Sequence, residues 1–252
     1  MITHLPLFSH PSPKNILIVG GGDGGVLREV CRHKCVQSIT MVEIDQLVID
    51  VAKKFFSNST ATSFDDPRLT IVNEDAAEFL RSKNYTDKNS CYDIIIADTS
   101  DPVGPAESLF DPSFYEQMHD ALKDGGIVCA QGECFWVHLD LIVNVVSCCS
   151  DIFDCVEYAS TMVPSYPCGQ IGFILAGKGK HVNFLKPQRT QDNFQSKLKW
   201  YNPSIHQSSF ILPQFMEEKL APLRPSRINF LVKDDEDNVE ENECFLSQCS
   251  IS

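Results

Sequence analysis

Short apolar runs alternate with longer stretches of helical periodicity through the first half of the chain. The runs are rich in β-branched residues and apolar at nearly every position, which is typical of strands buried on both faces of a parallel sheet. Strands are expected at 16–19, 39–43, 69–72, 93–97 and 126–130, and crossover helices at 25–33, 46–56, 76–80 and 112–122. The repeated β-α-β units predict an α/β fold with a doubly wound, mostly parallel sheet and right-handed crossovers.

The second half of the chain continues this pattern and then loses it. A helix is expected at 137–149, followed by strands at 155–162 and 172–176 that a proline-rich loop at 164–167 joins. Further helices are expected at 193–198 and 213–220. We therefore predict a catalytic domain over residues 1–221 and an acidic, disordered tail over 222–252.

Charge and composition exclude several classes of protein. The 252 residues carry a net charge of -13, and seven of the acidic residues lie between 234 and 243. Binding of DNA or RNA needs clustered Lys and Arg, so a nucleic-acid partner is not expected, whereas a cationic ligand suits this charge. No apolar stretch approaches the roughly 18 residues of a membrane span, and no secretory signal is visible. We expect a cytoplasmic protein without a membrane partner.

The eleven cysteines do not form a recognisable framework. Their number is odd, no C-x-x-C motif occurs, and most lie in apolar stretches where a reduced cysteine acts as a small core residue. Cys31, His33 and Cys35 have no second ligand pair spaced to complete a zinc site. We therefore predict reduced cysteines and no metal.

Polar residues follow each of the five expected strands. In open parallel sheets, ligands bind beyond the carboxyl ends of the strands, so these residues are the candidates for chemistry. They are the glycine loop 20–25, then Glu43, then Asp75, then Asp98, and finally Gln131. One such residue is commonly only a turn or a helix cap, but five successive strands delivering acidic or amide groups to one edge indicate a binding site.

The glycine loop indicates a nucleoside ligand. Gly20, Gly22 and Gly25 satisfy G-x-G-x-x-G, and Glu43 follows at about the 20-residue spacing of the acid that binds ribose hydroxyls. Asp23 places a carboxylate where a pyrophosphate would approach the helix N-terminus, and two anions there would repel. A sulfonium nucleoside fits better than a dinucleotide, with Asp23 facing its cationic end and Asp75 near the adenine edge.

Two further carboxylates indicate amine chemistry. Asp98 and Asp101 lie three residues apart in the loop after the fourth strand. Paired carboxylates in a dry pocket can hold an alkylammonium ion. A primary ammonium, with a pKa of about 10.4 in lysine, is not nucleophilic until a base takes its proton. The sequence thus predicts an amine held beside an electrophile, with a carboxylate as the base.

Five motifs together resemble the spermidine synthases of the aminopropyltransferase family. They are GGGDGG at 20–25, VEID at 42–45, DTSDPVGPAESLF at 98–110, CAQGEC at 129–134 and PSYPCGQIGF at 164–173, within a match from Met1 to about Leu220. The resemblance implies a methyltransferase-like Rossmann fold. It also implies aminopropyl transfer from decarboxylated S-adenosylmethionine to putrescine, which gives spermidine and methylthioadenosine without a metal.

The resemblance also implies roles for individual residues. Asp98 corresponds to the proton acceptor, Asp101 and Tyr166 to putrescine-binding positions, and Gln131 to a polar residue near the substrate amine. The positions that correspond to nucleoside-binding residues are Asp23, Glu43, Asp75 and Ala76, with Gly20 and Gly22 in the loop. The family often has glycine where this chain has Ala76, which crowds the adenine side slightly.

The largest departure from the family is at the front of the chain. Family members carry a small N-terminal β domain, which helps to form the homodimer, and a segment just before Met1 that contributes to the active site. We expect this chain to lack both, which leaves its dimerisation open. One alternative is therefore a weakly active or inactive member that binds nucleoside or pairs with a full-length subunit.

Other functions are disfavoured by single features. Related putrescine N-methyltransferases resemble this chain but lack the Asp of GGGDGG, so Asp23 argues against an amine N-methyltransferase. Asp23 also argues against an NAD-dependent enzyme, because its carboxylate would repel the pyrophosphate of the dinucleotide. The loop at 98–107 resembles the putrescine-using branch of the family more than the spermine synthases.

Overall fold

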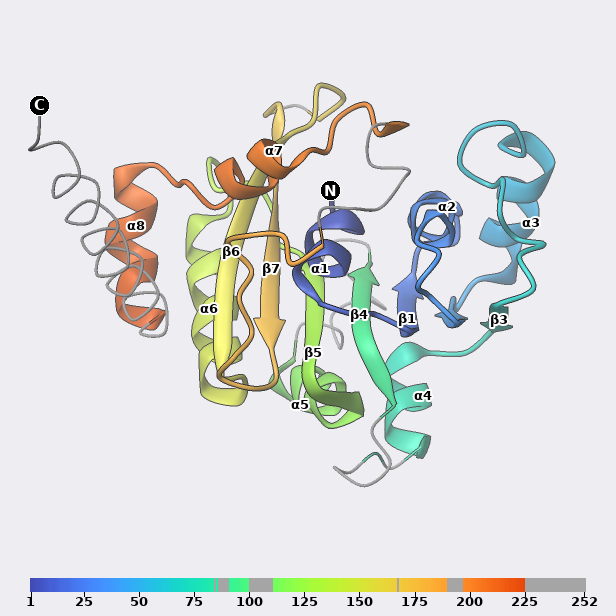
Figure 1. Ribbon diagram of the computed structural model, residues 1–252, viewed down its shortest axis with the longest axis horizontal. Coiled ribbons are helices and arrows are strands. Elements are labelled where there is room, and N and C mark those ends of the chain that lie inside the picture. Colours follow the sequence, from blue (N-terminus) through green and yellow to red (C-terminus); the bar gives the residue numbers. More distant parts are fainter. Residues whose placement is uncertain (84, 86–90, 100–110, 167, 190–196, 225–252) are drawn as a thin grey trace, which may run out of the picture.

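One mixed seven-stranded sheet forms the centre of the molecule (Figure 1). The computed structural model describes residues 1–83, 85, 91–99, 111–166, 168–189 and 197–224. The strand order is β3-β2-β1-β4-β5-β7-β6. The strands are β1 (Asn15–Gly20), β2 (Ser38–Val42), β3 (Leu69–Val72), β4 (Tyr92–Asp98), β5 (Leu122–Gln131), β6 (Cys155–Met162) and β7 (Gln170–Gly177).

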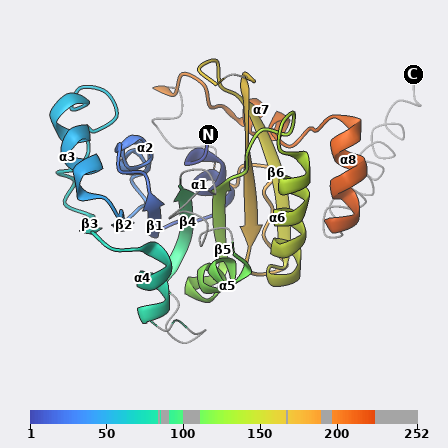
Figure 2. The same cartoon turned by 180° about the vertical axis from the view of Figure 1, so that it is seen from behind.

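Helices cover both faces of this sheet (Figures 1 and 2). They are α1 (His4–Ser9), α2 (Gly25–Arg32), α3 (Gln46–Phe55), α4 (Ala76–Lys83), α5 (Pro112–Ala121), α6 (Leu139–Ile152), α7 (Pro203–Ser208) and α8 (Gln214–Leu220), with a 3₁₀ turn at Ala221–Leu223. Among the described residues, no helix is both long and apolar enough to cross a membrane.

The alternation of side chains along each strand divides the core into two layers. Leu17 and Val19 of β1 face one layer, where α4, α5, α6 and α8 pack. Ile16 and Ile18 face the other, where α1 and α2 pack. Nearly every position of β1, β4 and β7 is therefore buried, whereas no position of the edge strand β3 is. This explains why the central strands read as continuous apolar runs rather than as alternating ones.

The register of the parallel strands brings their carboxyl ends to one edge. Gly20 pairs with Asp98, and Val19 pairs with Val42. Ala97 of β4 pairs with Ala130 of β5, so Gln131 follows at the same level. β7 runs antiparallel to both β5 and β6. The expected doubly wound, mostly parallel α/β sheet is confirmed.

Several details differ from the expectations. α1 was not predicted, because its six residues include Pro6 and show no full helical period. α7 was also missed, although Pro203 occupies its first turn and the side chain of Asn202 caps it. The helix before β5 ends at Ala121, and β5 begins at Leu122 rather than at the expected residue 126. Residues 193–196 of the expected 193–198 helix, Asp101, and the tail from 225 lie outside the described residues.

A buried arginine ties the end of the described chain to the sheet. Arg224 is 1% exposed, and its guanidinium donates to the carboxylates of Glu157 at 2.8 Å and Glu217 at 2.7 Å. Its Nε also donates to the carbonyl of Leu220 at 3.2 Å. Glu157 lies on β6 and is itself buried. The two opposite charges compensate each other in the core.

Replacing this arginine should therefore be costly. We expect Arg224→Met to lower the free energy of unfolding by about 3 kcal/mol, because the buried Glu157 carboxylate loses its hydrogen-bonded contact with the guanidinium. Urea denaturation measures the change. The double variant Arg224→Met with Glu157→Gln should recover a large part of the loss. A single variant within about 0.5 kcal/mol of the parent, the range of ordinary surface substitutions, would contradict this assignment.

Candidate active site

The loop after β1 is built from glycines because two acidic residues approach its backbone. Gly20 has a φ of +73°, and a Cβ there would collide with the carbonyl oxygen of Asp98. A Cβ on Gly22 would lie 2.8 Å from Oε2 of Glu43. The missing side chains let the N–H of Gly22 donate to Glu43 at 3.1 Å and the N–H of Gly21 donate to the Asp98 carbonyl at 3.1 Å.

Glu43 is held firmly at the end of β2. Its side chain is buried, and Oε1 accepts the backbone N–H of Asp45 at 3.0 Å while Oε2 accepts that of Gly22. The Asn73 side-chain amide donates to the Glu43 carbonyl at 2.8 Å. Each carboxylate oxygen retains acceptor capacity beyond one N–H bond, so Glu43 can still accept hydroxyl groups of a ligand.

Asp23 is an exposed residue of the same loop. Its carboxylate accepts the N–H of Gly25 at 2.9 Å, the first residue of α2. It also lines a hollow of about 300 Å³ against the apolar side chains of α3, among them Leu47 and Val51. The carboxylate is therefore positioned by the loop while remaining open to a ligand.

Asp98, Gln131 and Tyr166 share one cavity of about 340 Å³. Asp98 ends β4, Gln131 ends β5, and Tyr166 lies in the loop between β6 and β7. The other described residues that line it are Met1, Ile2, Thr161, Met162, Val163, Ile171, Phe173 and Trp200. Three predicted site residues from distant parts of the sequence thus meet around one space.

The electrostatic setting of Asp98 suits a base. Burial, together with the neighbouring carboxylates of Asp23 and Glu43, raises the pKa of Asp98 from 3.8 to about 6. All three effects disfavour its charged form. A carboxylate with this pKa is mostly ionised at neutral pH, yet it binds a proton more strongly than an ordinary aspartate.

The remaining predicted residues are placed as follows. Asp75 directly precedes α4, and its side chain accepts the N–H of Glu78 at 2.9 Å. Ala76 is the first buried residue of that helix. The structure therefore gives Asp75 a capping role, which leaves its second oxygen for a ligand. Asp101 lies outside the described residues.

Sequence reasoning missed the apolar walls of the cavity. Trp200 is the clearest example: its indole N–H donates to Oγ1 of Thr161 on β6 at 3.2 Å, which orients the ring. Met162, the last residue of β6, is 69% exposed despite its apolar side chain. No local motif marks either residue, because their role arises only when remote segments meet.

The described residues contain no group of three or more His, Cys, Asp or Glu side chains that could hold a metal ion. The site presents carboxylates, a glycine loop and an amide. Such a set can accept hydroxyl and ammonium donors from an organic ligand and can take up a proton at Asp98.

Comparison with known proteins places this arrangement among polyamine enzymes. The spermine/spermidine synthase domain matches residues 1–186. The chain is 47% identical over 220 residues to a spermidine synthase of Dictyostelium discoideum, covering 87% of this chain and 75% of that protein. It is 46% identical over 226 residues to spermidine synthase 2 of Arabidopsis thaliana, covering 86% of this chain and 65% of that protein. It is also 46% identical over 233 residues to a spermine synthase of the same plant, covering 90% of this chain and 64% of that protein.

Solved structures agree in fold as well as in sequence. A spermidine synthase in complex with the transition-state analogue AdoDATO superimposes with a TM-score of 0.80 at 35% identity, covering 88% of this chain and 74% of that one. The spermidine synthase of Thermotoga maritima gives a TM-score of 0.76 at 34% identity, covering 88% and 72%.

The raised pKa of Asp98 predicts a pH-dependent cost to stability. The folded state holds this proton up to about pH 6, whereas an unfolded aspartate loses it near 3.9. The free energy of unfolding should therefore fall as pH rises from about 4 to 6, by about 2 kcal/mol from this residue. Asp98→Asn should match the parent near pH 4 and exceed its stability at pH 8. Chemical denaturation at both pH values tests this, with Asp50→Asn on α3 as the control, and parallel pH curves for parent and Asp98→Asn would contradict it.

Proposed function

Because the chain belongs to the spermine/spermidine synthase family, we propose that it transfers the aminopropyl group of decarboxylated S-adenosylmethionine to putrescine. The products are spermidine and methylthioadenosine. The observation that carries the proposal is the position of Asp98: a partly buried carboxylate with a raised pKa, in one cavity with Gln131 and Tyr166 and beside the glycine loop. A transfer between two cationic reactants needs a base in such a place.

The sulfonium nucleoside binds along the glycine loop in this proposal. Glu43 accepts the ribose hydroxyls, and its two backbone hydrogen bonds hold the carboxylate in position for them. Asp75 and Ala76 contact the adenine. Asp23 faces the aminopropyl end, whose ammonium group needs an anionic partner. Gly20 and Gly22 leave room for the ligand because they carry no Cβ.

Putrescine occupies the cavity next to Asp98. One amine lies near Asp98 and Gln131, and the tetramethylene chain lies along apolar walls that include Ile171 and Phe173. Tyr166 and Asp101 complete the amine site. Asp98 accepts a proton from the ammonium, and the freed lone pair attacks the methylene carbon next to the sulfonium. The carbon–sulfur bond then breaks, and its electron pair leaves on the neutral thioether of methylthioadenosine.

The charge of the site explains why so many carboxylates gather there. Both reactants are cationic and would repel each other in a neutral pocket, so carboxylates are needed to bring them together. The sulfonium charge disappears in the reaction as the amine proton passes to Asp98. Alignment of amine, carbon and sulfur, together with the exclusion of water, should supply much of the rate acceleration.

The two parts of the chain have different roles in this function. Residues 1–221 form the catalytic domain, and residues 222–252 form an acidic extension. Putrescine is the small-molecule partner, and the cytoplasm is the proposed place of action.

Decarboxylated S-adenosylmethionine and putrescine, assayed by mass spectrometry, test the reaction. We expect spermidine and methylthioadenosine in equal amounts, and little product with S-adenosylmethionine as the donor.

Asp98→Asn should lower turnover by about 10² or more, because it keeps the shape but removes the proton acceptor. Glu43→Gln should mainly weaken nucleoside binding. Methylated putrescine from S-adenosylmethionine would instead show an N-methyltransferase, and near-normal turnover of Asp98→Asn would remove it as the base.

Asp23 should determine the choice of donor. Decarboxylated S-adenosylmethionine ends in an ammonium group, whereas the methionine end of S-adenosylmethionine also carries a carboxylate that Asp23 would repel. Asp23→Asn should therefore weaken binding of the decarboxylated donor by about tenfold, the worth of one charge-assisted hydrogen bond, and weaken S-adenosylmethionine much less. Calorimetry with both nucleosides measures this. An equal loss for both would show that Asp23 only shapes the loop.

A further inference from the structure

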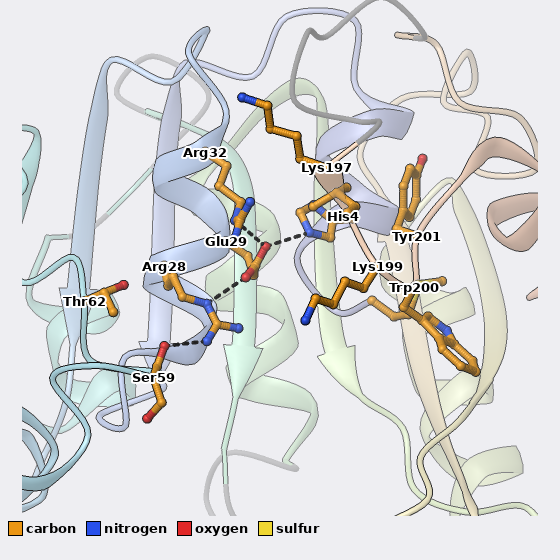
Figure 3. Close-up of a pocket in the computed structure, with 12 residues that line it drawn as sticks. His4, Arg28, Glu29, Arg32, Ser59, Thr62, Lys197, Lys199, Trp200 and Tyr201 are labelled. Atoms are coloured by element: carbon orange, nitrogen blue, oxygen red, sulfur yellow. Dashed lines mark hydrogen bonds and ion pairs between the residues drawn. The ribbon is translucent and has the colours of Figure 1, made fainter.

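A second and larger cavity lies between α2 and the segment at 197–201. Its volume is about 650 Å³, roughly twice that of the cavity at Asp98. Figure 3 shows Arg28 and Arg32 one turn apart on α2, with Lys197 and Lys199 extending toward that helix from the opposite wall. Four cationic side chains thus surround one space in a protein whose net charge is -13.

The only acidic residue among the described lining residues, Glu29, is already engaged. Its carboxylate lies 2.7 Å from Nε of Arg28, 2.9 Å from Nε of Arg32 and 3.1 Å from Nε2 of His4. Burial alone would raise the pKa of Glu29, but hydrogen bonds from His4 and Arg28 outweigh it and lower this pKa to about 2. Glu29 therefore stays ionised and holds the two arginines in place, but it offsets only one positive charge.

The lysines have no such partner. Within the described part of the chain, neither Lys197 nor Lys199 forms an ion pair or a hydrogen bond. Burial lowers the pKa of His4, so this histidine adds no charge at neutral pH. The cavity consequently carries about three positive charges in excess, an arrangement whose self-repulsion costs stability unless an anion enters.

The donors are already arranged for a ligand. Nη1 of Arg28 donates to the carbonyl of Ser59 at 2.7 Å, so the guanidinium plane is fixed from two sides. Thr62 lines the same wall. Planar guanidinium groups bind phosphoryl oxygens with two parallel hydrogen bonds, and lysines add point charges. A dianionic or trianionic group matches the excess charge better than a single carboxylate does.

We propose that this cavity is a binding site for a small phosphoryl-bearing anion, held by Arg28 and Arg32 on one side and by Lys197 and Lys199 on the other. The site is distinct from the one proposed for the amine, because the cavity at Asp98 contains a carboxylate and no cationic side chain among its described lining residues. Met1 and Trp200 line both cavities.

Calorimetry of the 252-residue chain with pyrophosphate and with inorganic phosphate tests the site. We expect saturable binding of one pyrophosphate per chain, weaker binding of phosphate, and a loss of affinity as NaCl is raised. Lys197→Gln with Lys199→Gln should weaken pyrophosphate at least tenfold, because each charge-assisted contact is worth about that factor. Arg32→Gln should also weaken it.

Lys219→Gln on α8 is the control for Arg32→Gln, since it also removes one positive charge, from an exposed position on a helix far from α2 (Figure 1). It should leave the affinity unchanged. The double lysine variant changes only exposed side chains, so its fold can be verified by its unfolding midpoint. Absence of pyrophosphate binding at millimolar concentration, or an equal loss in the Lys219→Gln control, would overturn the proposal.

Discussion

The site depends on one constraint, which is the close approach of the glycine loop to Glu43 and Asp98. Gly22 must lack a Cβ for its N–H to reach Glu43, and Gly20 must lack one because Asp98 lies directly beside it in the sheet. The parallel register of β1 with β2 and β4 sets this proximity. A side chain at either glycine would separate the strand ends and displace the carboxylates from one another.

This proximity has an electrostatic cost that the backbone partly offsets. Glu43 is stabilised by two N–H donors, whereas Asp98 is raised in pKa by burial and by its acidic neighbours. The same arrangement therefore produces one carboxylate that backbone donors hold in place as a ligand group and one whose pKa is raised to about 6. Proteins commonly accept such local instability where it serves chemistry, and the rest of the core compensates for it.

The features that could be predicted from the sequence are those carried by local patterns. The buried strands were recognisable because both of their faces are apolar, and Glu43, Asp98 and Gln131 were recognisable because each directly follows a strand. α1 and the role of Trp200 were not, since a short helix with a proline has no clear period and a cavity wall is formed by residues far apart in the chain. The capping bond of Asp75 was likewise hidden, because an aspartate before a helix fits both a cap and a ligand contact.

Trp200 has a consequence for how the two cavities relate. The residue lines both, and a hydrogen bond from its indole N–H to Thr161 holds the ring in one orientation. A ligand that displaced Trp200 on entering one cavity would therefore also alter a wall of the other. Thermodynamic linkage requires any such influence on binding to be equal in both directions.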